Sequence, residues 1–146
     1  MPKTEANLWK SLKQILPNKT HAQRVENRST QGMPDVYMCM DGVPFWLELK
    51  IIKNNRVLVS KSQIAWNLAH SRCGGVSFFL LHAPSTGDVF LFEGKYALEI
   101  HGSRIDDLCA CGPAPLWYGP LRELPANLRP AALSLWSLKL EQQPEL

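Results

Sequence analysis

The sequence has no long apolar run and few cysteines, and these absences exclude several classes of protein. The longest apolar stretches, such as residues 78–81, are far shorter than the ~20 residues that span a bilayer, and no signal-peptide core is present. We therefore expect a cytoplasmic protein without membrane spans. The cysteines lack zinc-finger spacing, and a cytoplasmic setting argues against a disulfide framework, so we expect free thiols at Cys39, Cys73, Cys109 and Cys111.

Charged residues are not abundant, but their distribution is uneven. They make up 20% of the 146 residues, against 45% hydrophobic residues, which is typical of one folded domain and excludes a disordered chain. Residues 1–72 contain eleven Lys and Arg against five Asp and Glu, a net charge of +6, whereas residues 73–146 have a net charge of −3. The basic half can attract a polyanion such as nucleic acid, although the same charges also suit a solvated surface.

Hydrophobic periodicity predicts a chain of alternating helices and strands. A helix begins after Thr4 and ends before Pro17, and Asp41-Gly42 lies between two segments of period-two alternation, which indicates a tight β-hairpin over residues 36–51. Residues 57–59 are interpreted as a short strand, residues 76–81 and 89–92 as two buried strands. The second helix runs from a Ser60 cap to about residue 71, with its apolar face formed by Ile64, Ala65, Leu68 and Ala69.

This order of elements predicts an α/β or α+β domain with a mixed central β-sheet flanked by helices. Six of the eleven prolines lie from Pro113 onward, so we expect loops and short helices there, with a last amphipathic helix near residues 131–141. We accordingly divide the chain into a core at residues 1–94 and a Pro-rich C-terminal extension at residues 95–146. This extension either packs on the core or forms a dimer interface.

The predicted hairpin brings two acidic residues together. If Asp41 and Gly42 are the two turn residues, Asp35 lies opposite Glu48 in a non-hydrogen-bonded pair, with Cα atoms ~4.5 Å apart. Opposed like charges destabilise a sheet unless a positive charge lies between them. A divalent cation such as Mg²⁺ or Mn²⁺ is the natural candidate, because carboxylate oxygens are the ligands it prefers.

Lys50 and Trp46 are among the residues on the face of the hairpin that contains these carboxylates. Lys50, two residues after Glu48, adds a cation beside the pair. The alternative is a plain Glu48–Lys50 surface ion pair, with Asp35 merely ending a loop. Trp46 either contacts a base or sugar or packs under the first helix.

Gly32-Met33-Pro34-Asp35, followed after twelve residues by Glu48-Leu49-Lys50, closely resembles the signature of the PD-(D/E)XK nuclease superfamily. A helix that begins Ser60-Lys61-Ser62-Gln63 strengthens the match. The ordered arrangement over about residues 4–92 is similar to small phage endonucleases, archaeal-type Holliday junction resolvases and VRR-NUC nucleases. The resemblance implies a restriction-endonuclease-like core and, if a phage encodes the chain, a location in the host cytoplasm.

The same resemblance implies a role for each motif residue. Asp35 and Glu48 would be metal ligands, assisted by the backbone carbonyl of Leu49, and the metal would be Mg²⁺ or Mn²⁺. Lys50 would position or activate the attacking water and stabilise charge on the phosphate. Gln63 resembles the helix glutamine that lines such sites, unless it is only a solvent-facing helix residue.

Many relatives add an acidic residue from the first helix, and two residues qualify. Glu5 either lies on the side of the first helix that faces the sheet, or only complements the helix dipole. Glu26 is the other candidate for this additional acidic residue. Arg24 and Arg28 flank Glu26 at period two and could grip phosphates. The candidate nucleic-acid contacts are Arg24, Arg28, Lys53 and Lys61.

The sequence thus predicts a metal-dependent DNA endonuclease. Branched or junction DNA, cut by a homodimer, is suggested by analogy with the small resolvases alone. The main alternative is an inactive protein with the nuclease fold that binds nucleic acid or a protein partner. A third reading, a structural interaction module, requires the carboxylate face of the hairpin to be packed under the C-terminal tail.

Overall fold

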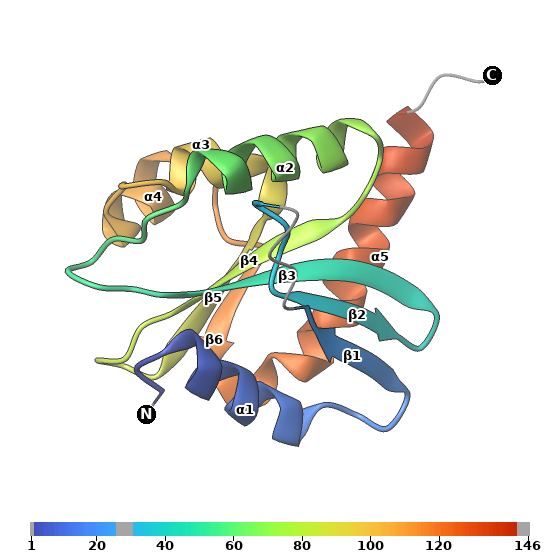
Figure 1. Ribbon diagram of the computed structural model, residues 1–146, viewed down its shortest axis with the longest axis horizontal. Coiled ribbons are helices and arrows are strands. Elements are labelled where there is room, and N and C mark those ends of the chain that lie inside the picture. Colours follow the sequence, from blue (N-terminus) through green and yellow to red (C-terminus); the bar gives the residue numbers. More distant parts are fainter. Residues whose placement is uncertain (1, 26–30, 143–146) are drawn as a thin grey trace.

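The structure, a computed structural model, describes residues 2–25 and 31–142, which build one mixed six-stranded sheet with helices on both sides (Figure 1). The strands lie in chain order across the sheet: β1 (Thr20–Arg24), β2 (Val36–Met40), β3 (Val43–Ile51), β4 (Ser77–His82), β5 (Asp88–Glu93) and β6 (Trp117–Pro120). Only β3 and β4 are parallel, and every other neighbouring pair is antiparallel. The predicted α/β fold with a mixed sheet is confirmed.

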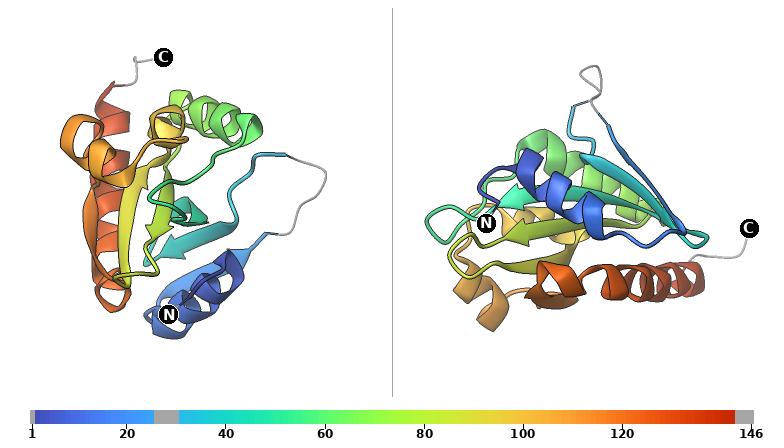
Figure 2. Two further views of the ribbon diagram at one scale, coloured as in Figure 1. Left: turned by 90° about the vertical axis from the view of Figure 1, so that its left-hand side faces the viewer. Right: turned by 90° about the horizontal axis from the view of Figure 1, so that it is seen from below.

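The five α-helices divide between the two faces of this sheet, as Figures 1 and 2 show. One face packs against the first and last helices, and the other against the three helices between them. Two short 3₁₀ helices, Gly94–Tyr96 and Leu121–Glu123, complete the fold. The α-helices are α1 (Glu5–Ile15), α2 (Lys61–Arg72), α3 (Ala97–Ile100), α4 (Ile105–Cys111) and α5 (Pro125–Gln142).

The β2–β3 hairpin has the predicted register. Met40 pairs with Val43 and Tyr37 with Trp46 on either side of the Asp41-Gly42 turn. Both turn residues have positive φ (44° and 85°), which asparagine, aspartate and glycine tolerate best. The hydrophobic core between the sheet and helices α1 and α5 is referred to as the first core cluster. Alternation directs one apolar row of the hairpin into it: Val36, Met38, Met40, Val43, Phe45, Leu47, Leu49 and Ile51.

The first two helices begin where the sequence predicts. The Thr4 side chain accepts a hydrogen bond from Asn7 N (3.2 Å), and Ser60 forms a complete capping box with Gln63. The apolar face predicted for α2 is wrong, however, because Ala65 and Ala69 are exposed and the fully buried residue is Asn67. Asn67 is buried because its side chain bonds to Ser77 and to Gln63 O.

Residues 95–142 add more regular structure than the prolines suggest. They supply the edge strand β6 and helix α5, which begins at Pro125 and not near residue 131 because proline is tolerated in the first turn of a helix. The α5 residues Leu128, Ala132 and Leu135 pack into the first core cluster. The division of the chain at residue 94 stays a prediction.

Residues 57–59 were predicted as a strand and do not form one. Val57 makes a single bridge to His101, and Val59 N donates to the His101 ring instead of a neighbouring strand. The four cysteines are free thiols, as expected, and three of them are exposed. Within residues 2–25 and 31–142, none of the helices is both long and apolar enough to cross a membrane.

Candidate active site

Asp35 and Glu48 meet at the end of the β2–β3 pairing, on the face opposite the apolar row. The backbone N–H of Asp35 donates to Glu48 Oε2 (3.0 Å), and the N–H of Leu49 donates to Asp35 Oδ2 (3.1 Å). Glu48 is only 3% exposed. The two carboxylates are therefore held beside each other by the backbone of adjacent strands, as the hairpin register predicts.

This arrangement makes it costly for both acids to be ionised. Burial, and then the charge of Asp35, raises the pKa of Glu48 to about 8. Burial also raises the pKa of Asp35, against the opposing effects of the Leu49 N–H and the positive charges of Lys50 and Arg24. A cation bound between the carboxylates would relieve this penalty, because it stabilises both ionised forms.

Gln63 connects the carboxylates to Lys50. Its Nε2 donates to Glu48 Oε1 (2.6 Å), and its Oε1 accepts from Lys50 Nζ (3.0 Å). Lys50 Nζ lies 3.9 Å from Glu48 Oε1. Gln63 Oε1 also accepts from Ser60 N (3.0 Å) in the capping box, so the start of α2 fixes this side chain toward the site and not toward solvent.

The residues before Asp35 pack closely on α2. Gly32 has a φ of 85°, and a Cβ there would collide with the backbone of Ser62 in the first turn of the helix. Val25 N donates to Asp35 O (2.7 Å), which connects this segment to the end of β1. Glycine is thus required so that Asp35 and Gln63 can approach the same point from two elements.

A hollow of about 390 Å³ adjoins Lys50. Glu5, at the start of α1, lines it together with Lys50 and Lys53. Glu5 is exposed, and not on the side of α1 that faces the sheet, yet its negative charge is near enough to contribute to the raised pKa of Asp35. Arg56 and Leu58 also line the hollow, and the sequence analysis did not single them out. The Asn54-Asn55 pair just before them is typical of a turn and could have drawn attention to this segment.

Of the other residues predicted to contact nucleic acid, neither Arg24 nor Lys61 lines this hollow. Arg24 ends β1 and is near enough to Asp35 to lower its pKa, so its charge acts on the site. Lys61, the first residue of α2, is exposed. Arg28 and the rival acid Glu26 lie outside the described residues.

Trp46 shares the carboxylate face but does not pack under α1. Its ring contacts Tyr37 and Trp66, at centroid distances of 5.3 and 5.8 Å. Trp66 in turn stacks on His70 at 4.6 Å. Of the two alternatives for Trp46, packing under the first helix is wrong, because α1 covers the apolar side of β3, whereas α2 covers the side to which Trp46 points.

The donor atoms of the site fit a hard divalent cation. Asp35 and Glu48 offer carboxylate oxygens, and the Leu49 carbonyl belongs to the residue between Glu48 and Lys50. No group of three or more His, Cys, Asp or Glu residues that could hold a metal occurs within residues 2–25 and 31–142. Mg²⁺ does not need one, since it commonly takes one or two carboxylates and completes its shell with water and substrate oxygens.

No protein-family model and no curated protein matches the sequence. Among solved structures, the chain is similar to Hjc of Archaeoglobus fulgidus, a Holliday junction resolvase from an archaeal hyperthermophile. The TM-score is 0.46 at 18% sequence identity, and the match covers 61% of this chain and 72% of that chain. At this level of similarity, the function of the chain has to be inferred from its own site.

Proposed function

We propose that this protein is a metal-dependent endonuclease that hydrolyses DNA phosphodiester bonds at Asp35, Glu48 and Lys50. The observation that supports it is the pair of carboxylates on adjacent strands, Glu48 buried and Asp35 half-buried, with a lysine joined to them through Gln63. A purely structural role does not account for this arrangement, because burying opposed acids lowers stability. The third reading is disfavoured because the helix side chains that contact Trp46, Glu48 and Lys50 on the carboxylate face come from α2 and not from the tail.

In this proposal, Asp35, Glu48 and the Leu49 carbonyl hold Mg²⁺ or Mn²⁺. When bound, the metal supplies positive charge to the phosphoryl oxygens and lowers the pKa of a coordinated water. Because the pKa values of Asp35 and Glu48 are raised, the two carboxylates together retain a proton near neutral pH when no metal is bound. Occupancy by a cation therefore requires that proton to leave, so metal affinity rises with pH.

Lys50 is the residue that we assign to the reacting phosphate. Its ammonium group is kept beside Glu48 by Gln63 Oε1, so it enters the reaction already oriented. In the reaction, the oxygen of water forms a new P–O bond, the P–O bond to the leaving oxygen breaks, and the leaving oxygen takes up a proton. Lys50 stabilises the negative charge that develops on the phosphate during this step. Glu5, across the adjoining hollow, is proposed as the additional acid.

The proposed substrate is DNA, positioned by phosphate contacts from Arg24, Lys53 and Lys61. Junction DNA is the branched form to test first, given the sequence resemblance to small resolvases. The homodimer and the cytoplasmic location stay predictions, and light scattering of the purified chain tests the first. Leu133, Leu138 and Leu140 of α5 are among the exposed apolar side chains that a second copy could cover.

The test is a cleavage assay on the full chain. Supercoiled, linear, single-stranded and four-way-junction DNA are each incubated with Mg²⁺, with Mn²⁺ or with EDTA. We expect cutting only with metal, and Lys50→Ala should lower the rate by at least ~100-fold, as expected for loss of a preorganised charge at a reacting phosphate.

Lys10→Ala, an exposed lysine on α1, is the matched control and should cut like the unchanged protein. Melting curves of all three proteins establish that they are folded. The proposal is wrong if the unchanged protein cuts none of the substrates with either metal, or if Lys50→Ala cuts at the full rate. Binding without cutting would favour the inactive nuclease-fold alternative.

A further inference from the structure

A small β-hairpin follows β3 and precedes α2. Asn54 and Asn55 occupy its two turn positions with φ values of 52° and 60°. Lys53 N donates to Arg56 O (2.9 Å), and Arg56 N donates to Lys53 O (3.0 Å). Asparagine tolerates this left-handed backbone, and residues directly opposite in a hairpin project to the same side. Lys53 and Arg56 are therefore neighbours on one side of the turn.

Arg104 extends this pair into a row of three cations. It forms an antiparallel bridge with Arg56, supported by a hydrogen bond from Ile105 N to Asn55 O (2.9 Å). Because the backbone groups of Arg56 already bond to Lys53, Arg56 and Arg104 are a non-hydrogen-bonded pair, the closer of the two classes. We refer to Lys53, Arg56 and Arg104 as the basic row.

The charges of the basic row are not neutralised by the described part of the chain. None of its three side chains has a carboxylate partner among the ion pairs formed by residues 2–25 and 31–142. Arg56 Nη1 donates to the Gly102 carbonyl (2.7 Å), which is uncharged. Like charges placed directly opposite each other destabilise paired strands. A bound anion would relieve the repulsion within the basic row, just as a cation would relieve it between the opposed carboxylates.

The basic row is continuous with the candidate active site. Lys53 and Arg56 line the same hollow of about 390 Å³ as Lys50. Leu58 also lines it and is 72% exposed, while Val57 and Val59 on either side of it are buried. Apart from the Glu5 carboxylate at the start of α1, the charged side chains of the hollow are cations, and they lie with one exposed apolar side chain next to the residue that we assign to the reacting phosphate. Phosphate, sugar and base together offer the matching chemistry.

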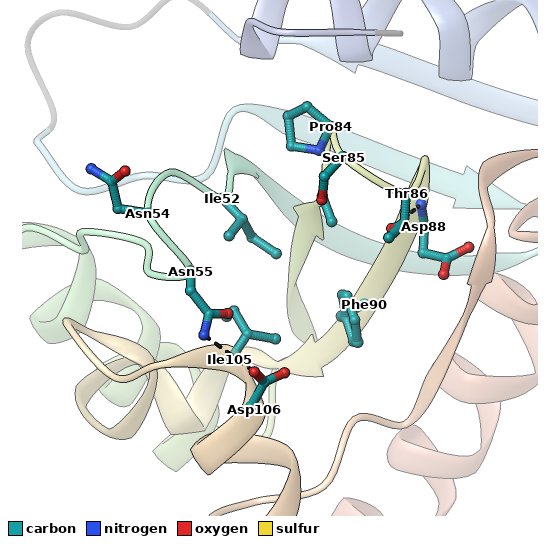
Figure 3. Close-up of a pocket in the computed structure, with 11 residues that line it drawn as sticks. Ile52, Asn54, Asn55, Pro84, Ser85, Thr86, Asp88, Phe90, Ile105 and Asp106 are labelled. Atoms are coloured by element: carbon teal, nitrogen blue, oxygen red, sulfur yellow. Dashed lines mark hydrogen bonds between the residues drawn. The ribbon is translucent and has the colours of Figure 1, made fainter.

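The opposite side of this hairpin has a different character. Figure 3 shows a second hollow, of about 540 Å³, between the turn, the residues 83–88 and the start of α4. Its charged lining residues are Asp88 and Asp106, and Asn55 donates to Asp106 (3.3 Å). A polyanion is therefore favoured only on the side of the basic row, and the Asn55–Asp106 bond helps to hold the turn in place.

We propose that the basic row binds consecutive phosphates of the DNA strand on one side of the cut, with Leu58 packed against the sugar or base between them. This inference rests on the proposed nuclease function and extends it by assigning the path of the substrate strand. The strand passes from the phosphate at Lys50, across the hollow, to Arg56 and Arg104. Backbone bonds from Gly102 N to Val57 O (2.9 Å) keep this surface fixed relative to the site.

The experiment measures DNA binding by the full chain with Ca²⁺ in place of Mg²⁺, using fluorescently labelled DNA of the form that it cuts best. Affinity is recorded over a range of salt concentrations for the unchanged protein and for Arg56→Gln/Arg104→Gln. Each phosphate contact contributes a slope of ~0.9 in log K against log salt, so the double variant should have a slope shallower by about 1.8 and bind roughly 10- to 30-fold more weakly at 0.15 M salt. Leu58→Ser should weaken binding without changing the slope.

A second substitution pair and a control exclude trivial explanations. Lys53→Gln/Arg104→Gln leaves the Arg56–Gly102 bond intact and should show the same change in slope. Arg122→Gln, an exposed arginine near β6, should behave like the unchanged protein. Melting curves check that each variant is folded.

The position of the contacts is tested with single neutral methylphosphonates on either side of the cut. The unchanged protein should lose affinity for substitutions at neighbouring positions on one side, and the double variants should not. If the unchanged protein cuts DNA but both double variants retain its affinity and slope, the basic row is not a substrate contact. If the unchanged protein neither binds nor cuts DNA, the proposed function itself fails.

Discussion

The two faces of strand β3 have opposite chemistry. On one face, alternate residues such as Phe45, Leu47 and Leu49 are buried in the first core cluster against α1 and α5. On the other face, Glu48 and Lys50 lie beside α2 with Gln63 between them. The same nine residues, Val43–Ile51, thus contribute both to the main core and to the candidate active site.

The comparison shows how stability and function are divided within one strand. Burial of apolar side chains against two helices stabilises the fold, at about 25 cal/mol per Å² of apolar surface removed from water. Burial of Glu48 works in the opposite direction, because its charged form loses hydration and faces Asp35. Adjacent positions should therefore respond to substitution with opposite signs.

Leu47→Ala and Glu48→Gln test this directly. Leu47 is fully buried, so Leu47→Ala should lower the free energy of unfolding by ~2–5 kcal/mol through lost contacts and a cavity. Glu48→Gln removes a buried charge and should raise the free energy of unfolding at pH 8, while abolishing metal-dependent cutting. Urea denaturation monitored by tryptophan fluorescence gives both values.

The sign of the Glu48 effect is the informative result. A Glu48→Gln variant less stable than the unchanged protein at pH 8 would mean that the hydrogen bonds donated by Asp35 N–H and Gln63 Nε2 to the carboxylate outweigh the cost of burying its charge. A Leu47→Ala variant as stable as the unchanged protein would mean that the apolar face is not the main core.

The same comparison predicts an unusual pH dependence in the absence of metal. Glu48 retains its proton up to about pH 8 in the fold, against a reference pKa of 4.5. Between these values the unfolded chain binds fewer protons than the folded chain, so the free energy of unfolding falls as pH rises and levels off above about pH 8. Asp35, whose pKa is also raised, adds to the fall at the acidic end.

Added Mg²⁺ should reverse this trend, because in the proposed function it binds the ionised pair. Melting temperatures measured from pH 5 to pH 9, with EDTA or with Mg²⁺, should diverge as the pH increases. Glu48→Gln should flatten the fall in EDTA and remove most of the gain from Mg²⁺. A metal-free melting temperature that stays level from pH 5 to pH 8 would contradict the assignment of a buried proton to this pair.

A smaller effect is expected where α2 is joined to β4. Ser77 Oγ donates to Asn67 Oδ1 (2.7 Å), and both residues are buried. Ser77→Ala leaves the Asn67 oxygen without this partner and should cost ~1–3 kcal/mol. Ser134→Ala, at an exposed position of α5, is the control and should change stability by no more than ~0.5 kcal/mol, both measured by urea denaturation. Equal values for the two would show that Asn67 is not held in this way.

Local patterns predicted the parts of the molecule that local physics controls. The Asp41-Gly42 turn and strict alternation defined the hairpin register, and with it the meeting of Asp35 and Glu48. The caps at Thr4 and Ser60 defined where two helices begin. These features depend on residues close in the sequence, so they could be predicted without the rest of the fold.

Other features depend on contacts between distant segments and were missed or misjudged. The buried face of α2 contains Asn67 because Ser77 supplies a polar partner ten residues away. The proline-rich end of the chain adds β6 because the free edge of β5 is available for pairing. Neither partner is visible in a local pattern of polarity.

By itself, the sequence determined the β2–β3 hairpin, its two faces and the opposed acids, because a turn type and a period of two leave a single register. Only the tertiary structure decided that Gln63 joins Lys50 to Glu48, that Gly32 packs on α2, and that Arg104 lies beside Arg56. Those contacts connect residues that are far apart in the chain, and they form only when helices and strands pack around a shared core.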